Sequence, residues 1–502
     1  MNQKHQVTLI LIIQALLVVG VTVAIGFRLM PVGVPGEWEW NRLADWAVLK
    51  WDGLLIAGAG VLIYAGFAAT GLHLLGTARS RGFEAACVGS LLFASICIQI
   101  IVPMGAPAGY DLTKWAAVNY IPGSAGYFQV AREKASDDTW KFLADYPFWI
   151  RSQDVFHIGT HPPGLIAAQC ILLRTMERSP RLAGALLDHM PPSVDAGFRI
   201  FANPNDRPLS RGERASLYAT ALLTLFACAG TVVPLYLLAR ASMPASAAWA
   251  AAALWPLAPA ANLFQPVADT AYPLLSTAAL ALSVWAARSY SAKSARRPIA
   301  AALLAVASGA VMALGMSFTL AFLPVGLIVA LTLLGSTSLT WGSRVFLILA
   351  TGVGFLVVVA VGWALTTANP FVIMTWNLKH HADFYVEYPR SYLRWLWVNP
   401  LETAIALGIP TAIWCMVGLL APRTIPVPAF ATLIVFVLIN LAGRNLGEVA
   451  RLWMLFMPPL LLAAGAGMSR LGARASALGA TTAMLGVETL ALQAMIQVVY
   501  PV

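Results

Sequence analysis

Long apolar runs separated by shorter polar stretches dominate the chain. Runs of about 17 to 25 residues are long enough to cross a bilayer as helices. They begin near Val7, Asp52, Phe83, Ala215, Ala245, Thr270, Pro298, Phe318, Val345, Thr403, Val427, Leu452 and Ala475. Since only helices or closed barrels satisfy the backbone in lipid, the pattern predicts an all-α, polytopic transmembrane bundle of about 13 spans.

The run after His161 is ambiguous, because Pro162 to Met176 is shorter than the roughly 20 residues of a usual span. If it does not cross and the N-terminus is cytoplasmic, the short basic loops fall on the cytoplasmic side, as the positive-inside rule requires. Those loops carry Arg79, Arg81, Arg240, Arg288, Arg344, Arg423, Arg470 and Arg474. We therefore expect a juxtamembrane segment here, which leaves the arginine-rich stretch 177–214 outside as an exception.

Five polar segments then share the extracytoplasmic side. They are 28–51, 107–214, 262–270, 366–402 and 443–451. Together they hold most of the acidic residues, with His157, His161, His189, His380 and His381. Because binding and catalytic groups concentrate in loops, we expect juxtamembrane helices and a single external site there.

Composition narrows the class of protein. The chain is 59% hydrophobic and 11% charged, with a mean hydropathy of +0.75, which excludes a soluble domain. The first 27 residues are too long an apolar segment for a signal peptide, so we expect a retained helix. The net charge of +10 resides in short loops, which favours anionic lipid over nucleic acid as a partner. The five cysteines form no CxxC pair, so neither disulfides nor a thiolate metal site is indicated.

The stretch 107–161 combines acidic and aromatic residues in a way that suits a sugar. Aromatic faces pack on pyranose rings, and a carboxylate within reach of a hydroxyl can act as general base. Asp111 and Asp154 are candidate bases, and Tyr127 and His157 are candidate substrate-binding residues. The alternative is an interfacial aromatic belt with solvated acids.

The THPPG sequence places His161 before the predicted start of a helix at the membrane surface. Pro163 and Gly164 fit a first helical turn, whose free N–H groups attract anions. His161 is therefore a candidate to supply a proton or a positive charge to a bound phosphate. Alternatively, it is only a polar cap of that helix.

The order GYFQVARE (126–133), LADYP (143–147) and THPPG (160–164) resembles the first outer loop of the GT-C glycosyltransferases that use polyprenyl-phosphate sugars. Protein O-mannosyltransferases carry HPPL at the corresponding place, and lipid A aminoarabinose transferases carry KPPL. The resemblance runs from about Phe83 onward and suggests a divergent branch. It implies that the segment after HPP is juxtamembrane and that His161 lies near the donor phosphate.

One family feature is absent. The family's Asp-Glu pair, whose aspartate is the catalytic base, aligns with Gly123 and Ser124. Asp111, Asp154, Glu37 and Glu39 are alternatives, and the sequence does not decide among them. Asp269, in NLFQPVADTAYPL, resembles the family's second outer-loop aspartate near the same site; an N-cap is its alternative role.

Two later segments add charged candidates. Arg390 and Arg394 lie four residues apart in the segment 377–402, so one helix face can present both to a phosphate. The alternative is a helix facing lipid headgroups. A metal site at His380, His381 and Asp383 is weakly supported, since adjacent histidines on a helix diverge. GRNLGEVARLW (443–453) resembles a GEVxRxW segment of GT-C-like proteins, and Glu448 and Arg451 are spaced to share a helix face.

The combined interpretation is a multi-pass glycosyltransferase of the inner (plasma) membrane, with its active site on the extracytoplasmic side. It transfers a sugar from a polyprenyl-phosphate donor to a lipid, glycan or protein acceptor. Residues 1–82 are predicted to be two added helices with an outer loop, and 83–502 the GT-C-like core. No cofactor is certain, and a divalent metal ion is left open. The alternatives are a secondary transporter or lipid flippase, and an inactive GT-C-like scaffold.

Overall fold

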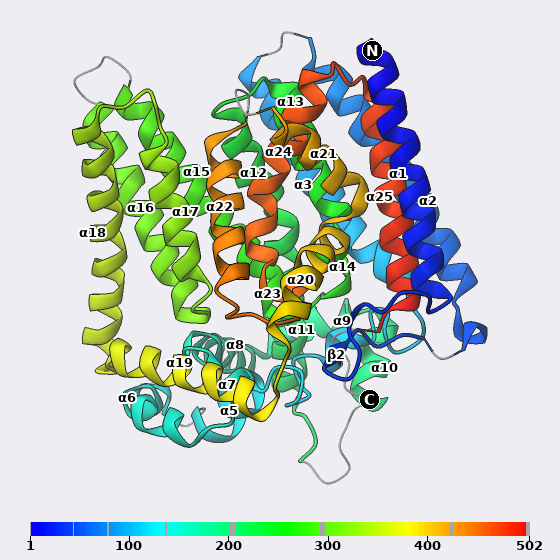
Figure 1. Cartoon of the computed structure of the whole chain (residues 1–502). Coiled ribbons are helices and arrows are strands. Elements are labelled where there is room, and N and C mark those ends of the chain that lie inside the picture. Colours follow the sequence, from blue (N-terminus) through cyan, green and yellow to red (C-terminus); the bar gives the residue numbers. More distant parts are fainter. Residues whose placement is uncertain are drawn as a thin grey trace.

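The computed structural model describes residues 2–43, 45–77, 80–135, 138–200, 207–291, 297–421 and 425–497. A tall bundle of α-helices stands on a layer of shorter helices that covers one end (Figure 1). The all-α prediction is confirmed, and a single two-residue β-ladder is present in the described part. Arg79 and Arg423, which the topology argument used, lie outside the described residues.

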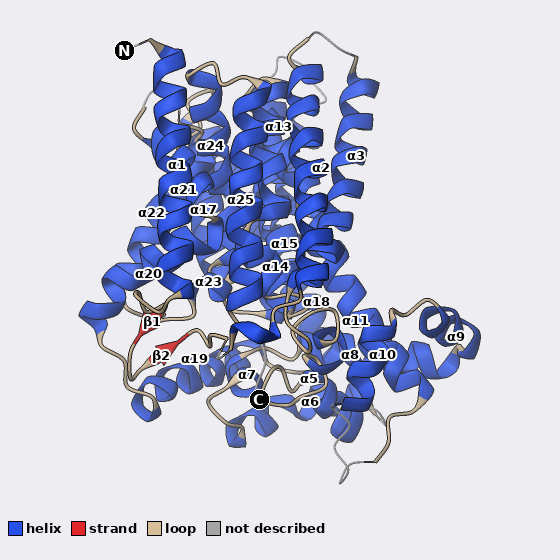
Figure 2. Ribbon diagram, turned by 90° about the vertical axis from the view of Figure 1, so that its right-hand side faces the viewer, coloured by secondary structure: helices blue, strands red, loops and turns tan. Residues whose placement is uncertain are grey.

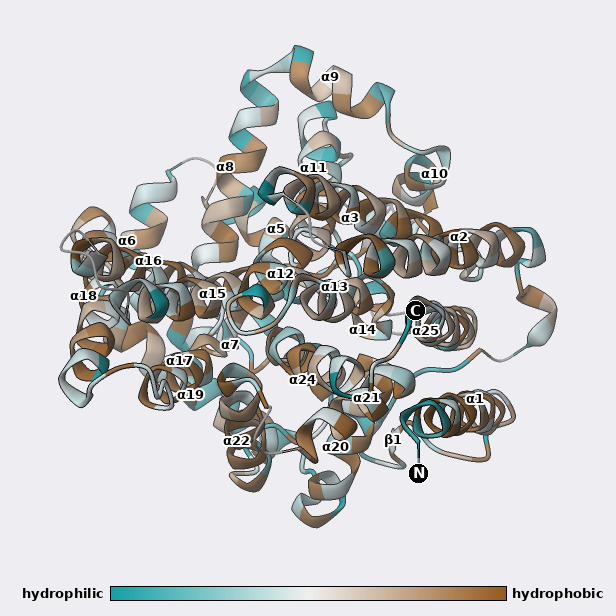
Figure 3. Ribbon diagram, turned by 90° about the horizontal axis from the view of Figure 1, so that it is seen from above, coloured by the Kyte–Doolittle hydropathy of each residue, from teal (hydrophilic) through white to brown (hydrophobic). Residues whose placement is uncertain are grey.

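Each predicted apolar run is helical in the structure. Eight of the described helices or helix pairs are long and apolar enough to cross a membrane, and the other runs hold shorter or bent helices. Hydrophobic residues predominate on helices at the edge of the bundle, such as α1 and α2 (Figure 3). The bundle helices are α1 (Gln3–Gly26), α2 (Trp51–Leu75), α3 (Arg81–Ile101), α11 (Arg211–Gly230), α12 (Val232–Arg240), α13 (Ala245–Leu254), α15 (Tyr272–Ser291), α16 (Arg297–Phe318), α17 (Phe322–Leu334), α18 (Trp341–Thr366), α20 (Tyr392–Leu407), α21 (Ile409–Leu419), α22 (Val427–Leu441), α24 (Met457–Arg470) and α25 (Ala475–Met495).

The shorter elements gather at the end opposite the start of α1 (Figures 1 and 2). They include strands β1 (Gly33–Val34) and β2 (Trp38–Glu39), and the helices α4 (Lys114–Ala117), α5 (Tyr127–Val130), α6 (Thr139–Trp149), α7 (His157–Thr160), α8 (Gly164–Arg178), α9 (Pro180–Asp188), α10 (Pro192–Ile200) and α19 (Pro370–Glu387). Two more, α14 (Pro259–Leu263) and α23 (Val449–Leu452), lie in the connections that dip toward the bundle.

Helix α8 is formed by the apolar run after His161, for which the sequence left open whether it crosses the membrane. It has 15 residues and lies in the layer of short helices rather than among the tall ones (Figure 1). Its first residue, Gly164, approaches α16 so closely that a Cβ would lie 2.3 Å from the carbonyl oxygen of Ser317. The glycine of THPPG is therefore required by close packing, and the juxtamembrane prediction is confirmed.

The arginines of the stretch 177–214, which break the positive-inside pattern, are mostly neutralised within the same layer. Arg207 pairs with Glu213 at 2.5 Å, and Arg132 reaches the same carboxylate at 2.8 Å. Arg199 and Arg214 both pair with Asp195, and Arg211 lies 3.7 Å from Asp188. Local carboxylate pairing therefore offsets much of the positive charge of this stretch.

The helices of residues 1–82 pack on the C-terminal helix of the chain. Helices α1 and α2 both lie along α25 (Figure 1). Gly486 of α25 makes a close approach there, because a Cβ would lie 2.1 Å from the Cγ1 of Val61. The division at residue 82 remains a prediction, and the two ends of the chain share a packed interface.

Helices α20 and α21 form one broken element, bent by 109° at Gly408. Gly408 has φ +92°, and a Cβ there would lie 2.0 Å from Leu485. The freed amide of Ile409 donates to the buried carboxylate of Glu488 on α25 at 2.8 Å. A side chain from another helix thus satisfies the backbone at the break.

Candidate active site

A cavity of about 1080 Å³ lies where the short helices meet the bundle. Each of the five predicted extracytoplasmic segments contributes side chains to its wall. Representative lining residues, in chain order, are Glu37, His161, Asp269, His381 and Arg451. Five segments that are far apart in sequence therefore meet at one cavity, as expected from their polar character.

The imidazoles of His157 and His161 enter the cavity from the short helix α7 and the residue that follows it. The Nδ1 of His161 lies 3.0 Å from the carbonyl oxygen of His157. Because a carbonyl only accepts, Nδ1 carries the proton and Nε2 of a neutral ring is left as an acceptor. Asn377 of α19 fixes this turn by donating to the carbonyls of Gly159 at 2.8 Å and His161 at 3.0 Å.

Both rings are neutral. Burial, and then the charge of Arg451, lower the pKa of His161 to about 4. The same two causes hold the pKa of His157 well below 6.5. The positive charge that was one of the roles expected for His161 is thus supplied by Arg451. His161 itself is a neutral hydrogen-bonding group.

Asp269 lines the cavity from the 3₁₀ turn Ala268–Ala271 at the start of α15. Val267 occupies the cap position of that turn, so the capping role considered for Asp269 is not what the structure has. The carboxylate forms no ion pair with any described residue. Tyr272 lines the same cavity, whereas Tyr127, predicted to bind substrate, does not line it. The Tyr127 hydroxyl instead donates to the carbonyl of His157 at 3.5 Å, and its ring packs edge-on against His161. Asp269 is therefore a carboxylate that is free to accept a proton from a bound hydroxyl.

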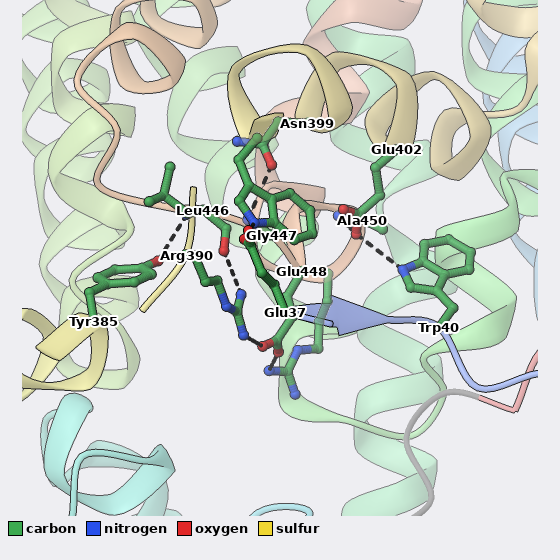
Figure 4. Close-up of polar contacts among 12 residues, drawn as sticks. Glu37, Trp40, Tyr385, Arg390, Asn399, Glu402, Leu446, Gly447, Glu448 and Ala450 are labelled. Atoms are coloured by element: carbon green, nitrogen blue, oxygen red, sulfur yellow. Dashed lines mark hydrogen bonds and ion pairs between the residues drawn. The ribbon is translucent and has the colours of Figure 1, made fainter. Parts of the chain in front are cut away.

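The cations of the cavity come from the loop 443–453 and its neighbour Arg390 (Figure 4). Glu448 lies between two guanidinium groups, at 3.1 Å from Arg390 and 2.9 Å from Arg451. The Arg390 side chain is 5% exposed and packs over Phe384 and Trp395. Arg451 is more open, at 16%. Arg390 thus acts mainly inside the wall, and Arg451 presents its charge to the cavity.

The carboxylates around Arg451 favour its charged form, which partial burial opposes. Burial alone would lower its pKa, but the neighbouring Asp269 and Glu448 outweigh that effect and raise the pKa of Arg451. Arg451 forms an ion pair with Glu448 and with no other residue in the described part of the chain. Guanidinium N–H groups therefore remain for an anionic ligand.

The consecutive residues Gly447 and Glu448 of the loop 443–453 both have a left-handed backbone conformation. Gly447 has φ +92°, and a Cβ there would lie 2.6 Å from the guanidinium of Arg390. Glu448 has φ +58°, a left-handed conformation that costs a non-glycine residue about 1 to 2 kcal/mol. The strained turn directs the Glu448 carboxylate between the two arginines.

Asp111 and Asp154 are not brought to the cavity. Asp111 pairs with Lys50 at 2.7 Å and accepts hydrogen bonds from the amide and hydroxyl of Thr113. Asp154 accepts from the amide of Phe156 at 3.0 Å, which caps the turn that leads to α7. Neither is a lining residue, so the structure separates them from His161 and Asp269.

Arg394 and Glu37 form an ion pair at the edge of the cavity. Arg394 is 65% exposed and lies 3.7 Å from Glu37, and it does not line the cavity. Glu37 lines it, but accepts hydrogen bonds from the amide and hydroxyl of Ser391 and from the indole of Trp395. Burial opposes these bonds, but they prevail and the pKa of Glu37 is lowered. A carboxylate so satisfied is a poor proton acceptor.

The described residues contain no group of three or more His, Cys, Asp or Glu side chains placed to hold a metal ion. The Nε2 of His380 lies 2.9 Å from the carbonyl of Ile150, and that of His381 lies 2.7 Å from the carbonyl of Arg444. Both imidazoles of the HHAD sequence therefore bind backbone in different directions.

Sequence reasoning missed two polar residues of the site. Tyr272 lines the cavity three residues after Asp269, a spacing that puts both on one helical side and could have identified it. Asn377 is fully buried, and its role depends on carbonyls 216 and 218 residues away, so no local signal pointed to it.

No protein family and no curated protein matches the chain. Among solved structures, the chain is similar to the Archaeoglobus fulgidus oligosaccharyltransferase tethered through a disulfide bond to an acceptor peptide containing the NVT sequon. The TM-score is 0.43 and the identity 12%, over 80% of this chain and 55% of that one. The chain thus spans about half the length of that enzyme.

Proposed function

We propose that the protein is a membrane glycosyltransferase of the GT-C type that transfers a sugar from a polyprenyl-phosphate donor to an acceptor hydroxyl or amide. One observation carries this proposal: an unpaired carboxylate, Asp269, and an open guanidinium, Arg451, face the same cavity at the end of a transmembrane bundle. Direct displacement at an anomeric carbon needs a base for the acceptor and a cation for the departing phosphate. The proposal depends on this geometry and not on the solved-structure likeness.

The roles follow from charge. Asp269 takes the proton of the acceptor as the new glycosidic bond forms. Arg451 stabilises the negative charge that develops on the phosphate as the bond from that phosphate to the sugar breaks. His161, neutral with Nε2 unprotonated, accepts a hydrogen bond from a donor or acceptor hydroxyl; it takes up a proton only when the added phosphate charge raises its pKa.

The lipid part of the donor accounts for the membrane bundle. The cavity wall toward the bundle is apolar, with Leu320, Leu323 and Pro324 at the start of α17 and Ile439 near the end of α22. Leu323 is 45% exposed on the surface of the bundle, where lipid would surround it. An isoprenoid chain can therefore remain among apolar side chains while its phosphate reaches Arg451.

We place the cavity on the extracytoplasmic side of the plasma membrane. The basic residues Arg240, Arg288, Arg344 and Arg470 lie near the ends of α12, α15, α18 and α24 that point away from the cavity, where the positive-inside rule puts the cytoplasm. In the same scheme, residues 83–502 form the transferase core and 1–82 an added pair of helices, and the acceptor is a lipid, glycan or protein.

A transporter or lipid flippase is the second candidate, and the broken element α20–α21 favours it. Transporters build their sites at discontinuous helices with buried charges near the middle of the membrane. Here Gly408 marks the break and Glu488 lies buried beside it. The break is satisfied by Glu488 itself, whereas the open charged groups lie at the cavity, so we favour the transferase.

The test is a transfer assay with the purified full-length protein in liposomes. Radiolabelled polyprenyl-phosphate hexoses and pentoses are supplied, with envelope lipid, glycan and peptide fractions as acceptors. We expect release of polyprenyl phosphate and label in one acceptor fraction. Movement of intact donor across the bilayer without release of polyprenyl phosphate would instead identify a flippase. If neither transfer nor movement occurs, the inactive GT-C-like scaffold is the alternative that remains.

A further inference from the structure

The loop 443–453, which carries Glu448 and Arg451, turns sharply before the short helix α23. Gly443, Gly447 and Glu448 all have positive φ, so the chain makes repeated left-handed turns there. The glycines adopt it freely, but for Glu448 it is strained and persists only where the surrounding structure fixes it. The direction in which Arg451 points therefore depends on residues outside the loop.

Helix α20 supplies the support through two side chains one turn apart (Figure 4). Asn399 accepts from the amide of Gly447 at 3.2 Å and donates to the carbonyl of Asn445 at 2.9 Å. Glu402 accepts from the amide of Ala450 at 3.2 Å, and Ala450 directly precedes Arg451. These bonds fix the loop immediately before and after Glu448.

Glu402 is costly in this position, which argues that it is kept for the loop. It is 2% exposed. Its Oε1 accepts hydrogen bonds from the backbone amide of Ala450 and from the indole N–H of Trp40, each at 3.2 Å. Its Oε2 has no hydrogen-bond partner among the described residues. A buried acid with one unsatisfied oxygen is a poor way to stabilise a core, where an apolar side chain would serve better.

We propose that Glu402, assisted by Asn399, is a positioning residue of the transferase: by holding the backbone of Gly447 and Ala450, it sets where Glu448 and Arg451 point. The inference rests on the proposed function, because Arg451 is the group assigned to the donor phosphate. Trp40 orients Glu402 from the segment 28–51, so the N-terminal part of the chain takes part in the site.

The central experiment compares Glu402→Leu with Glu402→Gln in the full-length protein. Leucine removes the acceptor for Ala450, whereas glutamine keeps an oxygen there. Glu488 offers a matched control pair, Glu488→Leu and Glu488→Gln. It is 1% exposed, accepts one backbone amide (Ile409) and has one oxygen without a partner, but it does not line the cavity.

We expect Glu402→Leu to lower kcat per folded molecule by about 10- to 100-fold, the loss that a misplacement near 1 Å causes. Glu402→Gln should stay within about threefold of the parent, because the oxygen is retained. In an Arg451→Ala background, Glu402→Leu should cause little further loss, since residues that act through one another are not additive. An unchanged kcat, an equal loss in Glu488→Leu, or full additivity with Arg451→Ala would each overturn the proposal.

A second measurement does not need catalysis. Amide hydrogen exchange across 443–453 should speed up in Glu402→Leu and not in Glu488→Leu. If the parent protein transfers no sugar, the proposed function fails, but this exchange result still decides whether Glu402 holds the loop. Should Glu402→Leu not insert, Asn399→Asp replaces it: it keeps an acceptor for Gly447, loses the donation to Asn445, and must loosen the same loop. Unchanged exchange in the variant that folds contradicts the inference.

Discussion

The segment 107–161 and the loop 443–453 both reach the candidate cavity, but they contribute different things to it. The longer segment is rich in acids and aromatics, and it folds into small helices that use most of those groups themselves. Trp115 and Tyr146 are buried in its core, and Asp111 and Asp154 bind Lys50 and a backbone amide. The shorter loop pairs Glu448 with its own Arg451 and with Arg390, and both loop charges line the cavity.

The difference teaches that a concentration of chemically suitable residues does not locate a site. A carboxylate whose oxygens are already held by a cation or by amide donors has fewer lone pairs open to a ligand. Asp111 has such partners, whereas Asp269 has none among the described ion pairs. If the partners of a carboxylate decide its role, substitutions at Asp111 and at Asp269 should differ in their effect on catalysis.

The largest effect is expected from Asp269→Asn. Removal of a general base should lower kcat by about 10²- to 10⁴-fold, with the amount of inserted protein unchanged. Asp111→Asn and Asp154→Ala are the matched controls, and each should keep kcat per folded molecule within about threefold. The Asp111 variant should instead melt at a lower temperature, because Lys50 loses its partner. A greater loss of kcat in Asp111→Asn or Asp154→Ala than in Asp269→Asn would reverse the comparison.

The next largest effect is expected from Arg451→Ala. Loss of a cation aimed at the developing phosphate charge should lower kcat/KM for the donor by about 10²- to 10³-fold. Arg451→Lys should recover part of it, since it keeps the charge without the planar fork. Arg394→Ala is the control, because that arginine is 65% exposed and does not line the cavity. Equal losses in the two alanine variants, measured with purified donor, would contradict the assignment.

The smallest effect concerns pH and His161. Its pKa of about 4 in the folded protein lies below the ordinary 6.5, so between these values the unfolded state binds the proton that the folded state refuses. Stability should therefore fall as pH drops from about 6.5 toward 4, and His161→Asn should flatten that fall. The measurement is the melting temperature in detergent from pH 4.5 to 7.5. His157 has the same sign and leaves a residual slope; an unaltered slope in His161→Asn would show that His161 is not buried in neutral form.

The sequence by itself determined the architecture and the end at which the site lies. Apolar runs of spanning length can satisfy their backbone in lipid only as helices, so their positions in the chain fixed the bundle. The segregation of His, Asp and Glu into five segments, with basic loops elsewhere, placed those segments together. His161, Asp269, Glu448 and Arg451 were all identified as candidates from such local patterns.

Only the tertiary structure decided which of the candidates meet. Lys50, which pairs with Asp111, lies 61 residues away in the sequence. Ser391 and Trp395, which donate hydrogen bonds to Glu37, lie more than 350 residues away. Asn377 and Glu402 act on backbone atoms of remote segments, which no side-chain pattern records. The strength of a base or a cation depends on distances and burial in three dimensions, and these are set by packing between segments rather than by the order of residues.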